Sequence, residues 1–397
     1  MNIKILKKYK MTAVMILCLV TLLALCACEA SEVPTAPSEE TPAEAQVTKT
    51  PEDNTPDVTE AAGKPEDTDY TEGLGETFSG ATESATESEG KPAEEEPKEE
   101  DDNKASDTKD IDLIFFMGQS NMSGAGGDAS QAPHVSPEAG MEFRAVSDPT
   151  TLYPITEPFG INENNPSGLH EYPQAKKGSL VSSFINEYHE LTGRKVIAVS
   201  MSMGATDMNT WISPGVTEDV KQRLDTTVSY LKNNGYTIGH MYALWLHGES
   251  DAIGHTDPAV YKTCLDDVMR PLFIGGVRKV FIIMPGRTID YKDIFLDIIK
   301  VQKDICAESD YYAVATTILT KVSTEYMLDM YHYNQHVLNM VGIESAKAVA
   351  YYTEHGVEKI VYDYREGKDI VPDGVEPGSQ GETERINLYE IDINSNY

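Results

Sequence analysis

A serine and an aspartate–histidine pair are the residues of this 397-residue chain whose types could together activate a nucleophile. Ser120 lies in the sequence GQSNM, which Met117 separates from the apolar run DLIFF, and Asp329 and His332 lie three residues apart in DMYH. A serine hydroxyl attacks a carbonyl carbon only when a base removes its proton and a third group orients that base. We therefore predict Ser120 as the nucleophile, His332 as the base and Asp329 as the residue that orients the imidazole.

The elements that must position these residues alternate along the chain from Ile111 onward. Nearly continuous apolar runs, typical of strands covered on both faces, occupy 112–116, 195–200, 240–246, 279–284 and 312–318. Helical patterns lie between and after them at 180–191, 216–231, 258–273, 292–307 and 334–352. This order predicts an α/β fold, a three-layer α/β/α sandwich with a central parallel sheet of about five strands. The stretch from about Gly124 to Gly178 does not follow the alternation, and we predict loops there that shape a pocket rim.

Polar or glycine-containing segments follow four of the predicted strands: 118–121, 203–206, 247–251 and 329–332. Because ligands bind at the carboxyl ends of parallel strands, these segments should line one crevice. A serine after a strand is most often a turn or cap residue, and His332 alone could be an ordinary loop histidine. The arrival of four chemically complementary segments favours the catalytic interpretation. Gly118 would let the backbone turn tightly before Ser120, whose own amide could face the carbonyl oxygen of a substrate.

These segments resemble the SGNH hydrolases, and within them the sialate O-acetylesterase-like and acetylxylan-esterase-like carbohydrate esterases, over roughly residues 111 to 352. GQSNM is similar to the nucleophile block of that branch, Gly204-Ala205-Thr206 followed by Trp211 to its glycine-glycine-threonine block, and DMYH to its terminal aspartate and histidine. The resemblance implies an SGNH or flavodoxin-like sheet, Ser120, His332 and Asp329 as the catalytic residues, and the Ser120 and Gly204 amides in an oxyanion hole. It implies no cofactor.

The segment WLHGESD resembles the third block of the branch, with one departure. Where the branch usually has glutamine as a side-chain donor to the oxyanion, this chain has His247. A neutral imidazole has one N–H to donate, so His247 is either the third oxyanion donor or a structural substitute. We expect Glu249 and Asp251 to orient loops, with Asp251 also a candidate cap for the helix that begins near Pro258. Further substrate contacts are predicted at Gln119, Asn121, Thr206, Trp211 and Glu249.

The predicted activity is a serine esterase that removes O-acetyl groups from carbohydrate, such as sialic acid, xylan or another acetylated glycan, through an acyl-enzyme. One alternative is a catalytically weak or silent glycan-binding surface lipoprotein of the same fold. Another, disfavoured by the lack of an apolar lid segment, is a hydrolase of lipid acyl chains. We predict no metal site, because His332 and His336 lack the HExxH pattern, and we place His336 at a helix start. We expect a monomer.

The N-terminus carries four lysines and then an apolar run, which is typical of a secretory signal over residues 1–27. Its end, Leu25-Cys26-Ala27-Cys28, resembles the lipobox of bacterial lipoproteins, which implies cleavage before Cys28 and lipidation of its thiol. The chain would then be anchored to the outer face of a bacterial membrane, at the cell surface. An ordinary signal peptide or an uncleaved anchor is the alternative.

Residues 28–110 form a predicted disordered linker rich in Glu, Asp, Thr, Ser, Pro and Ala, which carries −20 of the net charge of −33. We interpret it as a stalk between membrane and esterase domain, with a partner-binding acidic tail as the alternative. The domain spans 111–356, and an extension of one or two strands follows over 357–397. The domain is also acidic, without a basic cluster, which argues against nucleic acid as a partner. Cys264 and Cys306 lack CxxC spacing, so we predict core thiols.

Overall fold

The computed structural model describes residues 109–290 and 293–386. The predicted signal peptide, the lipidation candidate Cys28 and nearly all of the predicted linker therefore lie outside the described residues. Within the described part of the chain, no helix has both the length and the apolar character needed to cross a membrane.

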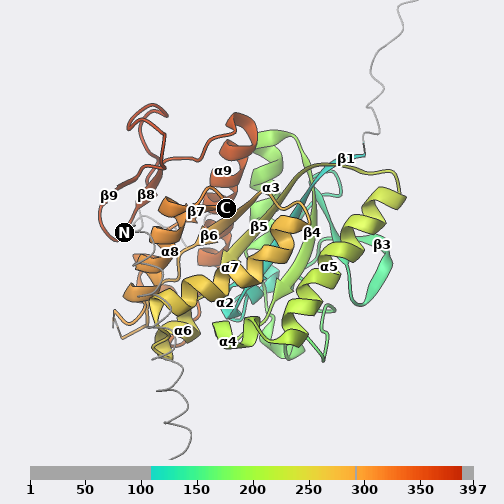
Figure 1. Cartoon of the computed structure of the whole chain (residues 1–397), viewed down its shortest axis with the longest axis horizontal. Coiled ribbons are helices and arrows are strands. Elements are labelled where there is room, and N and C mark those ends of the chain that lie inside the picture. Colours follow the sequence, from blue (N-terminus) through green and yellow to red (C-terminus); the bar gives the residue numbers. More distant parts are fainter. Residues whose placement is uncertain (1–108, 291–292, 387–397) are drawn as a thin grey trace, which may run out of the picture. The chain divides into compact units, whose positions relative to one another are not determined.

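The described residues form a seven-stranded, mostly parallel sheet in the order β3-β2-β4-β1-β5-β6-β7 (Figure 1). Its strands are β1 (Asp110–Gly118), β2 (Gly140–Arg144), β3 (Asp148–Pro154), β4 (Lys195–Ser202), β5 (Thr237–Leu246), β6 (Lys279–Ile283) and β7 (Tyr312–Thr316). The chain reverses its direction of progress across the sheet at β1, which pairs in parallel with β4 and with β5. A reversal of this kind opens a crevice at the carboxyl ends of the strands.

The register places three loops side by side at that crevice. Gly118, the last residue of β1, pairs with Ser202 at the end of β4 and with Leu246 at the end of β5. The chain segments that leave these three strands therefore begin at the same level of the sheet.

Helices cover both faces of the sheet (Figure 1). On one face, α5 (Pro214–Asn233), α7 (Pro258–Ile274) and α8 (Leu296–Glu308) pack with the short helix α4 (Met208–Trp211) against side chains such as Phe115 and Trp245. On the other, α3 (Val181–Thr192) and α9 (Gln335–His355) pack against Phe116 and Leu244. Burial of alternate strand residues on opposite faces gives the two apolar cores that hold the three layers together.

The five predicted strands and five predicted helices are confirmed, and so is the placement of His336 in the first turn of α9. The stretch between Gly124 and Gly178 differs from the prediction, because it contributes β2 and β3 as well as loops. β2 has only five residues, and β3 is an antiparallel edge strand that begins DPTT and is half exposed. Neither strand therefore carries the long apolar run that identifies a buried strand in a sequence.

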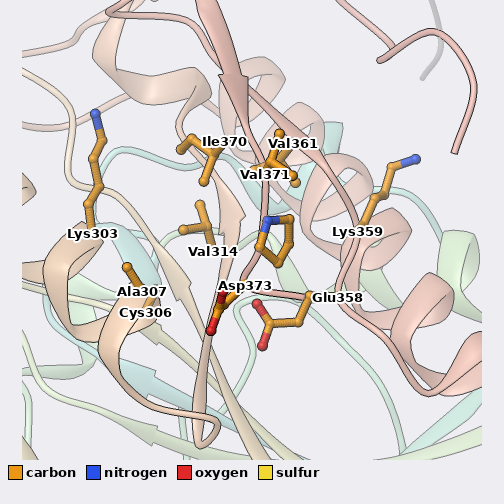
Figure 2. A pocket seen from close by; sticks show the side chains of 11 residues that line it. Lys303, Cys306, Ala307, Val314, Glu358, Lys359, Val361, Ile370, Val371 and Asp373 are labelled. Carbon is orange, nitrogen blue, oxygen red and sulfur yellow. The ribbon is translucent and has the colours of Figure 1, made fainter. Parts of the chain in front are cut away.

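The chain after α9 forms an antiparallel pair of short strands, β8 (Val361–Asp363) and β9 (Lys368–Ile370). This pair, α8 and β7 surround a pocket of about 250 Å³. Figure 2 shows Val314, Val361 and Ile370 among its lining side chains, with Lys303 on one side and Lys359 on the other. None of the predicted site residues lines this pocket. Cys264 in α7 and Cys306 in α8 are free thiols, as predicted.

Candidate active site

Ser120 lies where β1 ends and the short helix α2 (Ser120–Ser123) begins. Gly118 has φ +135°, and a Cβ on this residue would overlap the carbonyl oxygen of Leu246, so the turn before the serine requires glycine. The Gln119 amide then donates to the Leu246 carbonyl oxygen over 3.0 Å. Because the first N–H groups of a helix have no partner within the helix, the Ser120 amide is a donor available to a substrate oxygen.

Asp329 and His332 form the predicted pair. His332 Nδ1 lies 2.7 Å from Asp329 Oδ2, and Asp329 Oδ1 accepts from the backbone amides of Tyr331 and His332 at 2.9 Å each. Burial would raise the pKa of Asp329, but the hydrogen bonds from His332 and the two amides hold that pKa below its usual value. The carboxylate therefore stays ionised and occupies Nδ1, which leaves Nε2 of the imidazole for proton transfer.

Asn121 joins the serine loop to the histidine loop. Its Nδ2 donates to the carbonyl oxygen of Tyr331 at 3.1 Å, and its Oδ1 accepts from the amide of Tyr333 at 3.4 Å. The residue after Ser120 thus holds both neighbours of His332. The structure brings together two segments that lie more than two hundred residues apart, as the sequence predicted. Among the hydrogen bonds of the described residues, none joins Ser120 Oγ to His332, a contact that in esterases commonly tightens only when substrate binds.

Gly204 lies beside the nucleophile, in the loop after β4. A Cβ built on Gly204 would lie 3.4 Å from the Cβ of Ser120. The next residue, Ala205, has φ +56°, a left-handed conformation that is uncommon for a residue with a side chain. The amides of Ser120 and Gly204 therefore come from two adjacent loops at the same end of the sheet.

His247 is not at the surface of the crevice. Its side chain is 0% exposed and its ring packs among Trp245, Trp211 and Tyr261, with centroids 4.7, 5.9 and 6.2 Å away. Burial lowers the pKa of His247 to about 3, so the imidazole is neutral. A ring with no accessible surface cannot touch a bound acyl group, and this geometry favours the structural interpretation of His247 over the oxyanion donor.

Three of the predicted substrate contacts are loop supports instead. Gln119, Asn121 and Glu249 are each at most 3% exposed. Gln119 Oε1 accepts from the amides of Gly248 at 3.2 Å and Ser250 at 3.4 Å, and Asn121 Nδ2 donates to Glu249 Oε1 at 2.9 Å. Burial raises the pKa of Glu249, against the effect of the Asn121 bond. These side chains connect the loops after β1 and β5, and their burial favours a supporting role over contact with substrate.

The other two predicted contacts, Thr206 and Trp211, are also internal. Trp211 is fully buried, and its Nε1 donates to Thr206 Oγ1 at 2.9 Å. Thr206 Oγ1 in turn donates to the carbonyl oxygen of Met203 at 2.8 Å. The pair closes the loop that carries Gly204, and neither side chain is free to bind substrate.

Asp251 does not cap the helix that begins at Pro258. The cap is Asp257, whose Oδ1 accepts from the amides of Ala259 at 2.9 Å and Val260 at 3.3 Å. Asp251 instead accepts from the Met208 amide at 3.1 Å, at the start of α4. Asp251 therefore orients a loop, as expected, and the loop is the one that leads into α4.

The sequence did not point to Glu171, which lies in the stretch between Gly124 and Gly178. A Cβ on Gly204 would overlap Glu171 Oε1. The Glu171 carboxylate and the Ser120 Cβ therefore both lie close to Gly204. The only sequence signal was its position in the predicted pocket rim. Among the described residues, no group of three or more His, Cys, Asp and Glu side chains could hold a metal ion.

Comparison with known proteins gives one family match. The family described as carbohydrate esterase, sialic acid-specific acetylesterase, matches residues 110–350, more than half of the chain. No curated protein matches.

Comparison with solved structures gives matches that include the following three. A protein from Arabidopsis thaliana is 14% identical, with 61% of this chain and 97% of that chain covered and a TM-score of 0.40. A carbohydrate acetylesterase from Xanthomonas citri is 13% identical, with 63% and 58% covered and a TM-score of 0.40. The acetylxylan esterase Axe2 from Geobacillus stearothermophilus is 11% identical, with 62% and 95% covered and a TM-score of 0.33.

Proposed function

Because the chain belongs to the carbohydrate esterase family of sialic acid-specific acetylesterases, and is therefore a carboxylic ester hydrolase acting in carbohydrate O-deacetylation, we propose that its catalytic residues are Ser120, His332 and Asp329. The observation that carries the proposal is the Asp329–His332 hydrogen bond on a loop that Asn121 fastens to the nucleophile loop. A hydroxyl, an imidazole and an oriented carboxylate are the three groups that acyl transfer to serine requires.

In the first step, Ser120 Oγ attacks the carbonyl carbon of an acetyl ester while its proton passes to His332 Nε2. The Ser120 and Gly204 amides donate to the oxyanion that forms on the carbonyl oxygen. Asp329 keeps the imidazole in the required tautomer and stabilises its protonated form. Expulsion of the sugar oxygen, which takes the proton from His332, leaves an acetylated Ser120.

In the second step, His332 removes a proton from a water molecule, and the resulting hydroxide attacks the acetyl group on Ser120. The tetrahedral intermediate is held by the same two amides and collapses to acetate. Ser120 Oγ recovers its proton from His332, so the enzyme returns to its starting state. Every step uses side chains and amides at the carboxyl ends of β1 and β4 and on the Asp329–His332 loop.

The test is acetate release by the purified protein and by two serine variants of the same short helix. Ser120→Ala should lower kcat on p-nitrophenyl acetate by at least about 10³-fold, because the nucleophile is lost. Ser123→Ala is the matched control: Ser123 is also buried in α2, and its hydroxyl has no hydrogen-bond partner among the described residues, so activity should be retained.

Unchanged release after Ser120→Ala would exclude the proposed mechanism. Glycan binding without any release of acetate, unaltered by Ser120→Ala, would instead support the alternative of a silent glycan-binding protein.

We also propose that the chain is held at the outer face of a bacterial membrane by a lipid on Cys28, with residues 29–110 as an acidic stalk. The support is the sequence alone, an apolar signal followed by Leu-Cys-Ala-Cys. Cys28→Ala should prevent labelling by an alkyne fatty acid and move the protein out of the membrane fraction, whereas Cys26→Ala should change neither. Labelling that survives Cys28→Ala would refute the anchor.

A further inference from the structure

Glu171 places a carboxylate beside the nucleophile. The residue follows the loop after β3, and its amide donates to Asn164 Oδ1 at 2.7 Å, which fixes the backbone there. A Cβ on Gly204 would overlap Glu171 Oε1 and would lie 3.4 Å from the Ser120 Cβ. The carboxylate and the nucleophile therefore flank the same glycine, whose amide is assigned to the oxyanion hole.

No partner neutralises this carboxylate directly. Glu171 Oε2 is closed off from solvent and has no hydrogen-bond partner among the described residues, and no ion pair of the described residues includes Glu171. Lys176 interacts electrostatically with Glu171, but it is 5% exposed and donates to Ser202 Oγ at 3.0 Å. Burial lowers the pKa of Lys176 to about 8, against the effect of Glu171.

The arrangement presents negative charge to a bound sugar. Glu171 is partly exposed whereas Lys176 is buried, and Oε2 but not Oε1 of Glu171 is closed off from solvent, so Oε1 is the atom that a substrate meets. The other carboxylate of the proposed site, Asp329, is ionised and bound to His332. His170, next to Glu171 and exposed, has its Nδ1 2.9 Å from the carbonyl oxygen of Gly168.

We propose that Glu171 is a specificity-determining residue: it accepts a hydrogen bond from a free hydroxyl beside the acetyl ester of an uncharged sugar and repels sugars that carry a carboxylate. Acetylated neutral sugars are then the substrates, and acetylated sialic acids are poor ones. The inference rests on the proposed function, since it assigns the substrate class of the same site.

The chemistry of the Glu171 carboxylate explains why an uncharged sugar is preferred over one that carries a carboxylate. An ionised carboxylate is an acceptor only, so it pairs with a sugar hydroxyl as donor. A second carboxylate at the same place would have no proton to share and would be repelled, and specificity often comes from such a repulsive contact. In a partly buried site this repulsion is screened much less than on an open surface.

The experiment compares a charged ester with its uncharged methyl ester and uses the ester of a neutral sugar as a reference. The kcat/KM for acetate release is measured on acetylated sialic acid, on the methyl ester of the same compound and on an acetylated methyl xyloside. For the native protein we expect at least about a tenfold preference for the methyl ester over the free acid. In Glu171→Gln, which keeps the size of the side chain and removes its charge, that ratio should fall towards one.

Glu190→Gln provides the matched control, because Glu190 is an exposed glutamate near the end of α3, and this variant should keep the native ratio. Equal rates on the acid and its methyl ester in the native protein would overturn the inference, as would a ratio that Glu171→Gln leaves unchanged. Turnover of the xyloside alone would overturn it too, because the uncharged sialic ester would then be rejected for another reason. Absence of acetate release from every ester would instead contradict the proposed function.

Discussion

Two histidines of this domain each have an aspartate close by, and their surroundings differ in every other respect. His332 is 22% exposed, and its Nδ1 lies 2.7 Å from Asp329. His247 and Asp251 are both 0% exposed, with 3.6 Å between Nδ1 and Oδ2, and the His247 ring packs against two tryptophans and a tyrosine. Both pairs lie in chain segments that follow strands of the same sheet, with Asp251 in the short helix α6 (Glu249–Ile253).

The difference shows that access to solvent, and not the pairing of residue types, decides which imidazole can transfer protons. His332 has an ionised carboxylate on one ring nitrogen and accessible surface on the ring. His247 has neither, and burial lowers its pKa to about 3, so it stays neutral over the range in which a general base must gain and lose a proton. The same two residue types therefore form the proposed catalytic pair in Asp329–His332 and part of an aromatic core in His247–Asp251.

The sharpest test exchanges each histidine for glutamine. His332→Gln should lower kcat on p-nitrophenyl acetate by about 10³-fold, because no base remains to take the Ser120 proton. His247→Gln should lower it by less than about tenfold, since the ring touches aromatic side chains and not the acyl group. Loss of an oxyanion donor typically costs about 10²–10³ in kcat, so a loss of that size in His247→Gln would restore the oxyanion role.

The aspartates extend the comparison with a smaller expected effect. Asp329→Ala should lower kcat by about 10²-fold or more with little change in KM, because the imidazole loses the group that fixes its tautomer. Asp251→Ala should act on stability instead, by about 1–3 kcal/mol in the free energy of unfolding, because the Met208 amide loses its acceptor. Steady-state kinetics and urea unfolding of both variants separate the two roles. Equal losses of kcat would show that the buried aspartate also serves the reaction.

Sequence patterns predicted the Asp329–His332 contact and the sheet because both depend on simple physical signals. Buried parallel strands need continuous apolar runs, and the ends of such strands converge, so Ser120 and the loop after β5 were assigned to one crevice. The direction of each side chain within that crevice was not predicted. Trp245 and His247 are two residues apart, so strand alternation puts them on the same face. Because Trp245 belongs to the apolar core, His247 also points into that core and away from the crevice.

Glu171 could not be predicted in the same way. Its distance from Gly204 depends on how the loops around β2 and β3 fold back over the sheet, and no periodicity in that stretch encodes the path. The internal partners of the predicted substrate contacts could not be predicted for a related reason. A polar side chain such as Thr206 or Gln119 has the same type whether it binds a sugar or a backbone amide, and only its partners distinguish the two.

The two histidines should also differ in how stability depends on pH. An unfolded histidine has a pKa of about 6.5, whereas that of folded His247 is about 3, so below pH 6.5 the unfolded chain binds a proton that the folded chain does not. The contribution of the neutral His247 ring to the free energy of unfolding is fully present above pH 6.5 and is lost as the pH falls towards 3. Between pH 7 and pH 4.5 it amounts to about 2–3 kcal/mol in the free energy of unfolding.

Urea unfolding at several pH values measures this contribution as the difference between the native protein and His247→Gln. Carboxylates that do not contact His247 are present in both proteins and cancel in that difference. A constant difference from pH 7 to pH 4.5 would mean that the buried ring is protonated in the folded protein, and the interpretation of His247 as a neutral core residue would be wrong.

The smallest expected effect concerns Thr206, whose hydroxyl accepts from Trp211, one of the aromatic residues around the buried His247. Thr206→Val keeps the shape of the side chain but leaves Trp211 Nε1 and the Met203 carbonyl oxygen without their partner, so the free energy of unfolding should fall by about 1–2 kcal/mol. Thr206→Ser retains the hydroxyl and should lose less. Because the threonine is 3% exposed and both of its hydrogen bonds are internal, KM for an acetylated sugar should be the same in both variants. A higher KM in Thr206→Val alone, at unchanged stability, would mean that the hydroxyl contacts substrate. The loop that carries Thr206 would then take part in substrate binding, and its burial would not separate it from the site of His332.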